Sequence, residues 1–177
     1  MADLRALVEG LGYGDVETLL NSGNVVFSAR TVRGDHADRI ERALRDRLEV
    51  SARVMVLSAP ELAEAVSQNP LAKVANDPAR MLVAVLRDPA DRARLRELEK
   101  QDRKPDRVVL GTRVAYLWCA TGIIESKLME AVARAVGDGA TCRNWATMTK
   151  LLAMAEGADE PVRKAPLRTS KLRMRRT

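Results

Sequence analysis

Arg80-Met81-Leu82-Val83-Ala84-Val85-Leu86 is the stretch that decides the fold. Every residue after Arg80 is apolar, so a strand formed here has no polar face to turn toward solvent. Strands of this kind lie in the middle of a sheet, with both faces covered. The segments that follow predict a helix, a hairpin, a helix, a strand and a last helix: 89–100, 107–110 with 113–119, 124–136, 140–143 and 145–156. This is the order of a βαββαβ unit with one added helix, in which strand 80–86 is central.

The first part of the chain repeats this order but opens directly on a helix. The apolar spacing predicts helices at 3–10, 35–48 and 59–68 and strands at 16–20, 25–27 and 53–57. Asn21-Ser22-Gly23-Asn24 joins the first two strands as a tight hairpin, because Gly and Asn tolerate a positive φ. The sequence therefore predicts an α+β fold of two tandem ferredoxin-like halves, the first of which lacks its opening central strand. Strands 25–27 and 53–57 are then expected to lack the neighbour that they would share.

This order of elements predicts that the chain has three parts: a first half at 1–75, a second half at 76–157 and a disordered basic tail at 158–177. Residues 161–177 contain seven Lys and Arg residues and no acid. Because the whole chain carries +6, the other 160 residues sum to −1. The positive charge thus belongs to the tail, which we expect to be solvated and to make weak contact with nucleic acid or an acidic partner.

Composition predicts a cytoplasmic protein with no membrane contact. No apolar run approaches the roughly 20 residues that span a bilayer, and Met1-Ala2-Asp3-Leu4 lacks the basic flank and apolar stretch of a signal peptide. Cys119 and Cys142 lie in predicted strands that are not neighbours in a βαββαβ sheet, which favours buried, reduced thiols over a disulfide. With one histidine and no CxxC pair, the sequence predicts no metal site, and it indicates no cofactor.

The sequence contains no catalytic arrangement that we recognise, since it has neither a Gly-x-Ser-x-Gly elbow nor a Ser-x-x-Lys pair. The best anion-binding candidates are Ser126 and Lys127, near the start of helix 124–136, where backbone N–H groups can hold a phosphate. Ordinary capping beside a surface lysine is the simpler interpretation. Arg143 and Asn144 begin the densest polar and aromatic cluster, but Asn144 is also a good N-cap for helix 145–156.

Tyr116 and Trp118 lie two residues apart on a predicted strand, so they share one face of the sheet. If that face is open, the two rings can stack on bases, as in RNA-recognition modules. Aromatic residues make up only 3% of the chain, however, and no string resembling the RNP1 motif is present. Burial of both rings under a helix or a second sheet is therefore the favoured interpretation.

Three motifs, in the same order, resemble those of a known family. The first is Ser22-Gly23-Asn24-Val25-Val26-Phe27; the second is Tyr116-Leu117-Trp118-Cys119 with Gly122 and Ser126-Lys127-Leu128; the third is Thr141 with Arg143-Asn144-Trp145 and Thr149-Lys150-Leu151. They closely resemble the bacterial domain of unknown function family 1697, from Met1 to about Ala155. The resemblance implies a duplicated α+β fold with two ferredoxin-like halves and a function that is uncharacterised.

The chain departs from this family at its start. Members usually begin with an apolar strand and a Gly-rich loop, whereas Met1-Ala2-Asp3-Leu4-Arg5 resembles the part of the family that comes directly after that loop. We therefore expect the chain to begin at an internal methionine. We also expect any site that the loop would complete to lie beside Ser22, Asn24 or Arg143.

Together these observations favour a non-catalytic or weakly ligand-binding domain of a cytoplasmic bacterial protein. The candidate ligand-binding residues are Ser22, Asn24, Ser126, Lys127, Arg143 and Asn144. Two alternatives stay open. One is a nucleic-acid-binding module that uses the basic tail and Tyr116/Trp118, and the other is an enzyme that acts on an anionic small molecule through Ser126, Lys127, Arg143 and Asn144.

Overall fold

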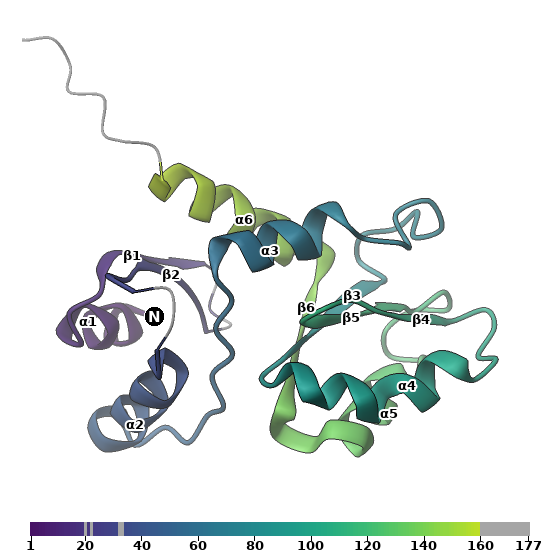
Figure 1. Cartoon of the computed structure of the whole chain (residues 1–177), viewed down its shortest axis with the longest axis horizontal. Helices are drawn as coiled ribbons and strands as arrows, with labels where there is room; N and C mark the ends of the chain where they lie inside the picture. The colour runs from purple at the N-terminus through teal and green to yellow at the C-terminus, as the bar shows by residue number, and fades with distance from the viewer. Residues whose placement is uncertain (20, 22, 32–33, 160–177) are drawn as a thin grey trace, which may run out of the picture.

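A computed structural model describes residues 1–19, 21, 23–31 and 34–159 of the 177-residue chain. Within these residues the chain forms six α-helices and two separate antiparallel sheets, one of two strands and one of four (Figure 1). The α+β class that the sequence predicts is therefore confirmed. From residue 160 onward, the predicted basic tail lies outside the described residues.

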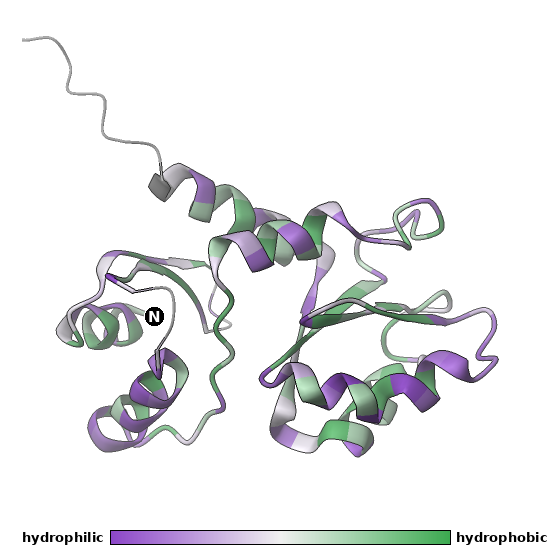
Figure 2. Cartoon of the chain, viewed as in Figure 1, coloured by the Kyte–Doolittle hydropathy of each residue, from purple (hydrophilic) through white to green (hydrophobic). Residues whose placement is uncertain are grey.

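The larger sheet is built from β3 (Met81–Leu86), β4 (Arg107–Leu110), β5 (Val114–Trp118) and β6 (Ala140–Asn144). Its strand order is β4-β5-β3-β6, and each neighbouring pair is antiparallel. All six residues of β3 are buried, and this strand is green along its length in Figure 2. The central position predicted for the apolar stretch is thus confirmed, because β5 and β6 pair with its two edges and helices cover its two faces.

Alternate residues of the larger sheet face two helical layers. On one side, α4 (Arg92–Lys100) and α5 (Leu128–Val136) pack against it, and the shared core includes Leu82, Leu86, Leu95, Leu117, Leu128 and Val132. On the other side lie α3 (Ala59–Ser67) and α6 (Trp145–Asp159), and the shared core there includes Leu62, Ala65, Met81, Val83, Tyr116 and Met148. Helix α3 follows the smaller sheet in sequence but lies on the larger one (Figure 1).

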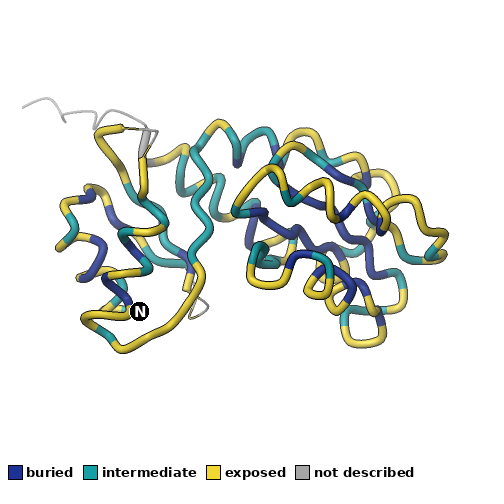
Figure 3. The backbone as a smooth tube through the Cα atoms, turned by 60° about the horizontal axis from the view of Figure 1, so that its bottom comes forward, coloured by how far each residue is buried: buried dark blue, intermediate teal, exposed yellow. Residues whose placement is uncertain are grey.

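The smaller sheet pairs β1 (Gly14–Leu19) with β2 (Asn24–Ser28), as the hairpin signal predicts. Helices α1 (Ala2–Gly10) and α2 (His36–Leu48) lie against it and bury Leu7, Val8, Ile40 and Leu44. Figure 3 shows this smaller buried group apart from the more extensive buried core of the larger sheet. The first part of the chain therefore has its own apolar core, and the residues described there form two paired strands.

The strand predicted at 53–57 is wrong, because these residues form no strand in the structure. Among the described residues, strand β2 pairs with β1 alone, and none of them forms a strand beside 53–57 that could bind its backbone. Side chains take over this role at Val54. Its N–H donates to Oε1 of Glu41 at 2.8 Å, and its carbonyl accepts from Nη1 of Arg87 at 2.8 Å.

Two arginines beside strands of the larger sheet hold this irregular segment, which passes between the two sheets in Figure 1. Arg87 follows β3, and its guanidinium forms ion pairs with Asp38 and Glu41 of α2. Arg113 precedes β5 and donates to Oε1 of Glu61 at 2.8 Å. These charged contacts attach the larger sheet to both helices that flank the segment.

Side-chain caps begin α3 and α6, as predicted for Asn144. The Ser58 hydroxyl accepts from the N–H of Glu61, and the Glu61 carboxylate accepts from the N–H of Ser58 at 2.8 Å, which completes the capping box at the start of α3. Oδ1 of Asn144 accepts from the N–H of Thr147 at 2.8 Å at the start of α6. In the part of the chain that is described, no helix combines the length and the hydrophobicity needed to cross a membrane.

Candidate functional site

Two of the predicted site residues, Asn24 and Arg143, meet at the junction of the two sheets. Asn24 opens β2 and is 6% exposed, and its Oδ1 accepts from Nε of Arg143 at 2.6 Å. Nη1 of Arg143 also donates to Oγ1 of Thr141 at 2.7 Å and to the carbonyl of Cys142 at 2.8 Å. Burial lowers the pKa of the Arg143 guanidinium, although the group stays charged at neutral pH. This pair joins the halves from inside the protein.

Ser126 and Lys127 lie elsewhere, in the loop that leads into α5. The Ser126 hydroxyl donates to Oδ2 of Asp106 at 2.7 Å and accepts from the N–H of Leu128 at 3.2 Å, so it caps the helix and fixes the loop. Ser126 is buried, whereas Lys127 is exposed. An exposed lysine beside a buried cap matches the simpler interpretation of these two residues.

The larger sheet separates these two groups. Arg143 pairs with Val83 on the neighbouring strand, so both side chains point to the face that α3 and α6 cover. Ser126 caps α5, which covers the opposite face. Asn144 serves as the N-cap of α6, and Ser22 lies outside the described residues. The structure thus brings together Asn24 and Arg143 but does not gather the candidates around one cleft.

The face that carries Tyr116 and Trp118 is closed. Tyr116 is 2% exposed and Trp118 is 6% exposed, and both belong to the core under α3 and α6. The Tyr116 hydroxyl donates to the carbonyl of Ala65 at 2.8 Å. The expectation that these rings are buried is confirmed, and they are not available to stack on bases.

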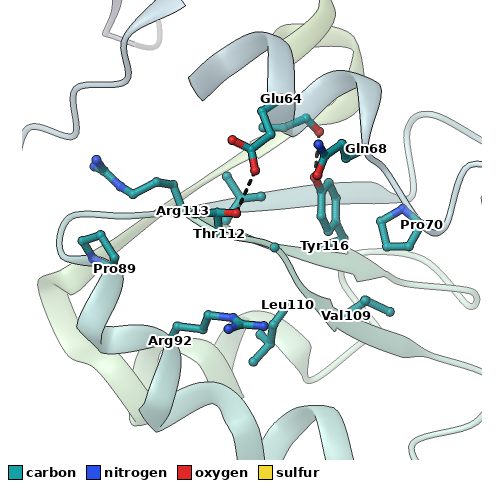
Figure 4. A pocket seen from close by; sticks show the side chains of 13 residues that line it. Glu64, Gln68, Pro70, Pro89, Arg92, Val109, Leu110, Thr112, Arg113 and Tyr116 are labelled. Atoms are coloured by element: carbon teal, nitrogen blue, oxygen red, sulfur yellow. Dashed lines mark hydrogen bonds between the residues drawn. The ribbon is translucent and has the colours of Figure 1, made fainter. Parts of the chain in front are cut away.

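A pocket of about 550 Å³ lies between α3, the start of α4 and the β4–β5 hairpin (Figure 4). Its apolar surface comes mainly from the hairpin and from two prolines, one in the turn after α3 and one at the start of the 3-10 helix before α4: Val109, Leu110, Val114, Pro70 and Pro89. Its polar side chains come from three separate parts of the chain: Glu64, Gln68, Arg92, Thr112, Arg113 and Tyr116. The pocket therefore has apolar walls and a few polar groups, which is the usual composition of a small-molecule site.

Internal contacts fix most of the polar groups in this pocket. The Thr112 hydroxyl donates to Oε1 of Glu64 at 2.7 Å, which ties the hairpin to α3 (Figure 4). Arg113 is paired with Glu61, so its charge is already balanced. Burial and the negative charge of Glu64 raise the pKa of Tyr116, so the phenol stays protonated and keeps its hydrogen bond to Ala65.

Arg92 differs from the other charged residues that line the pocket. It is the exposed first residue of α4, and among the described residues no carboxylate forms an ion pair with it. Figure 4 shows its side chain extending from α4 toward Leu110, across from the wall formed by Glu64 and Gln68. The pocket therefore combines one unneutralised guanidinium with an apolar floor.

No local pattern in the sequence predicts this pocket. Its walls come from residues 64–70, 89–92 and 109–116, which no motif connects. The only indirect sign was the basic residue at the start of α4, where the helix dipole favours acids over bases. In the part of the chain that is described, His, Cys, Asp and Glu residues form no group of three that could hold a metal ion.

Comparisons with known proteins agree with the fold. Residues 1–116 match the model of the family described as Protein of unknown function (DUF1697). The chain is similar to the solved structure of the conserved bacterial protein SP0830 from Streptococcus pneumoniae, with 20% identity, a TM-score of 0.66 and coverage of 88% of each chain. No curated protein matches the chain. At 20% identity, the similarity to SP0830 shows the fold alone.

Proposed function

Because the chain belongs to the DUF1697 family of proteins of unknown function, we propose a role from its own geometry: a non-catalytic domain that binds a small ligand. The observation that carries this proposal is the pocket between α3 and the β4–β5 hairpin, with its apolar floor and its fixed polar groups. Its volume of about 550 Å³ is within the range of small-molecule sites.

The sequence motifs support a non-catalytic role in this proposal. Asn24 and Arg143 bridge the halves, Asn144 caps α6, and Ser126 fixes the loop before α5. The enzyme alternative has less support, because Ser126 and Arg143 belong to opposite sides of the larger sheet. The proposal also includes a weak ligand site beside Asn24 and Arg143. Binding there is expected to be weak because the two side chains already form a hydrogen bond with each other.

Titration of the isotope-labelled full chain with a library of small aromatic fragments tests the pocket. We expect amide shifts at Ala65, Gly111 and Val114, which line it. Gln68→Trp should abolish these shifts, because Gln68 is an exposed residue of the pocket wall and a large side chain there fills the space. Ser67→Trp is the matched control, since Ser67 is exposed and does not line the pocket. If no fragment shifts these amides, or if Gln68→Trp leaves the shifts unchanged, the pocket is not a ligand site.

The proposal also holds that the two sheets are two ferredoxin-like halves, the first without its central strand. The order β6-β3-β5-β4 of the larger sheet supports this, because it is the strand order of a βαββαβ unit. The smaller sheet has the same succession of helix, hairpin and helix. Placement in the cytoplasm is a further part of the proposal, and the two free cysteines fit a reducing compartment.

A second candidate function is weak binding of nucleic acid or an acidic partner by residues 161–177. The observation that favours it is the seven basic residues without an acid, and these residues lie outside the described structure. Counterion release would make such binding fall steeply with salt. Removal of residues 158–177 should abolish duplex binding that depends on salt, and unchanged binding would eliminate the tail as the site.

A further inference from the structure

We propose that the ligand of the pocket is a small organic anion with a flat ring, and that Arg92 binds its anionic end. This inference rests on the proposed function of the pocket and adds the chemical class of the ligand. The anionic group is a carboxylate or a phosphate monoester, because both accept two parallel hydrogen bonds from a guanidinium. An arginine suits this task better than a lysine, whose ammonium group is a point charge.

The position of Arg92 has no evident structural purpose. As the first residue of α4, it places a cation at the positive end of the helix, which is unfavourable for the helix itself. Its neighbour Arg94 has a carboxylate partner, since it pairs with Asp91 at 3.2 Å. Arg92 forms no such pair with any described residue, and its side chain lies along the α4 side of the pocket with its guanidinium near Leu110 (Figure 4). A charged group held over a pocket without a partner is suited to bind an anion.

Among the described residues, the other charged groups of the pocket form no ion pair with Arg92. Glu61 balances Arg113 through a contact of 2.8 Å. Glu64 lies on the opposite wall, where its carboxylate accepts from the neutral Thr112 hydroxyl and keeps its negative charge. The pocket is therefore polarised, with a positive charge at the α4 side and a negative charge on α3, so an anion is favoured only at the Arg92 end.

The floor between these two sides indicates the shape of the ligand. Val109, Leu110 and Val114 line the hairpin side, and Pro70 and Pro89 lie at its margins. A flat ring can cover this apolar surface while a short acidic arm reaches Arg92. A ring N–H would then face the side-chain oxygens of Glu64 and Gln68 on α3. Indole derivatives with an acidic arm have these features and are suitable probes.

The test compares three probes on the full chain by calorimetry and by amide shifts of the pocket residues. Indole-3-acetate carries a carboxylate, indoxyl phosphate carries a phosphate monoester, and indole-3-acetamide is a neutral analogue. We expect both anions to bind about tenfold more tightly than the amide, because each gains a charge-assisted contact. The relative affinity of the two anions identifies which acidic group the pocket prefers. Raising NaCl from about 50 mM to about 500 mM should reduce the advantage of the anions.

Arg92→Gln should remove the preference for the anions and leave the weak binding of the amide unchanged. Arg94→Gln is the matched control, because Arg94 is an exposed arginine of the same helix that does not line the pocket. Equal affinity for the acetate and the acetamide would overturn the assignment of an anionic ligand, even if the fragment titration supports the pocket. Failure of all three probes to shift the pocket amides would also overturn it, and the fragment titration then decides whether the pocket binds any ligand.

Discussion

Nε of Arg143 on β6 donates to Oδ1 of Asn24 on β2 at 2.6 Å, so this side-chain contact joins the two sheets. The two residues are separated by 119 positions in the sequence. Their contact lies at the start of β2 and near the end of β6, where α6 begins. Substitutions of these two residues therefore measure how much this contact contributes to the free energy of unfolding.

Asn24→Ala and Arg143→Lys should each lower the free energy of unfolding by about 1 to 2 kcal/mol, because each leaves a partly buried group without its charge-assisted partner. The double variant should lose less than the sum of the single losses, with a coupling of about 1 kcal/mol. Urea unfolding of the four proteins measures this. Arg134→Ala, which breaks an exposed pair of 3.7 Å with Glu130, should change stability by less than about 0.5 kcal/mol. Strictly additive losses would show that Asn24 and Arg143 do not interact.

Stability should fall in acid because of Glu41 and Glu61. Burial alone would raise the pKa of each carboxyl group, but hydrogen bonds and nearby arginine charges together lower the pKa by more. Hydrogen bonds from Val54 and the charge of Arg87 lower the pKa of Glu41, and bonds from Ser58 and the charge of Arg113 lower that of Glu61. A lowered pKa in the folded state stabilises the protein above the ordinary value of 4.5, and this contribution is lost as the pH falls through the folded pKa.

Urea unfolding at a series of pH values from about 7 to about 3 checks this expectation. Glu41→Gln and Glu61→Gln should each flatten the acid side of the stability curve, because the titrating group is gone. Glu130→Gln is the control, since its carboxylate is exposed and its pair with Arg134 is long. An acid slope that is the same in Glu41→Gln, Glu61→Gln and the unmodified chain would show that other groups cause the dependence.

The two thiols should react slowly in the folded protein. Burial raises the pKa of Cys142 to about 11 and also raises that of Cys119, which is fully buried. At about pH 8, only about one thousandth of the Cys142 side chains are then thiolates, which are the reactive form. Dithionitrobenzoate should release two equivalents rapidly from the urea-unfolded chain and react with the native chain only as it unfolds. Rapid reaction of native Cys142→Ser would show that Cys119 is accessible.

Leu95→Ala should be strongly destabilising. The Leu95 side chain on α4 is 0% exposed in the core between α4, α5 and the larger sheet, so its loss leaves a cavity. The free energy of unfolding should fall by about 2 to 5 kcal/mol. Ile124→Ala removes a similar side chain that is 94% exposed and should change stability by less than about 0.5 kcal/mol. Thermal or urea unfolding distinguishes the two, and a small effect of Leu95→Ala would contradict the position assigned to α4.

The larger sheet could be predicted from sequence because its signals are local. The apolar stretch of β3 identified the central strand, and the N-cap Asn144 located the start of α6. The strand predicted at 53–57 was wrong for a reason that is not local. Its residues have a β-prone pattern, but a strand also needs a neighbour, and Glu41 and Arg87 bind the Val54 backbone instead.

The candidate site was less accessible to prediction. Asn24 and Arg143, two of the candidate residues, are in contact, but the motif residues around Ser126 belong to another side of the sheet. The pocket depends on α3 lying on the larger sheet, and neither hydrophobic periodicity nor capping says which sheet a helix covers. Arg92 could therefore be recognised only after Glu64 and Thr112 were seen on the opposite wall.

The position of α3 affects how the polypeptide can be divided for study. A cut after Asp77 would separate Leu62 and Ala65 from Met81 and Tyr116. Both fragments would then expose apolar side chains that are buried in the intact chain. A cut between Leu57 and Ser58 would keep α3 with the sheet that it shields. The product that starts at Ser58 should therefore be the more soluble of the alternatives, and limited protease digestion in the 49–57 segment is the natural way to obtain it.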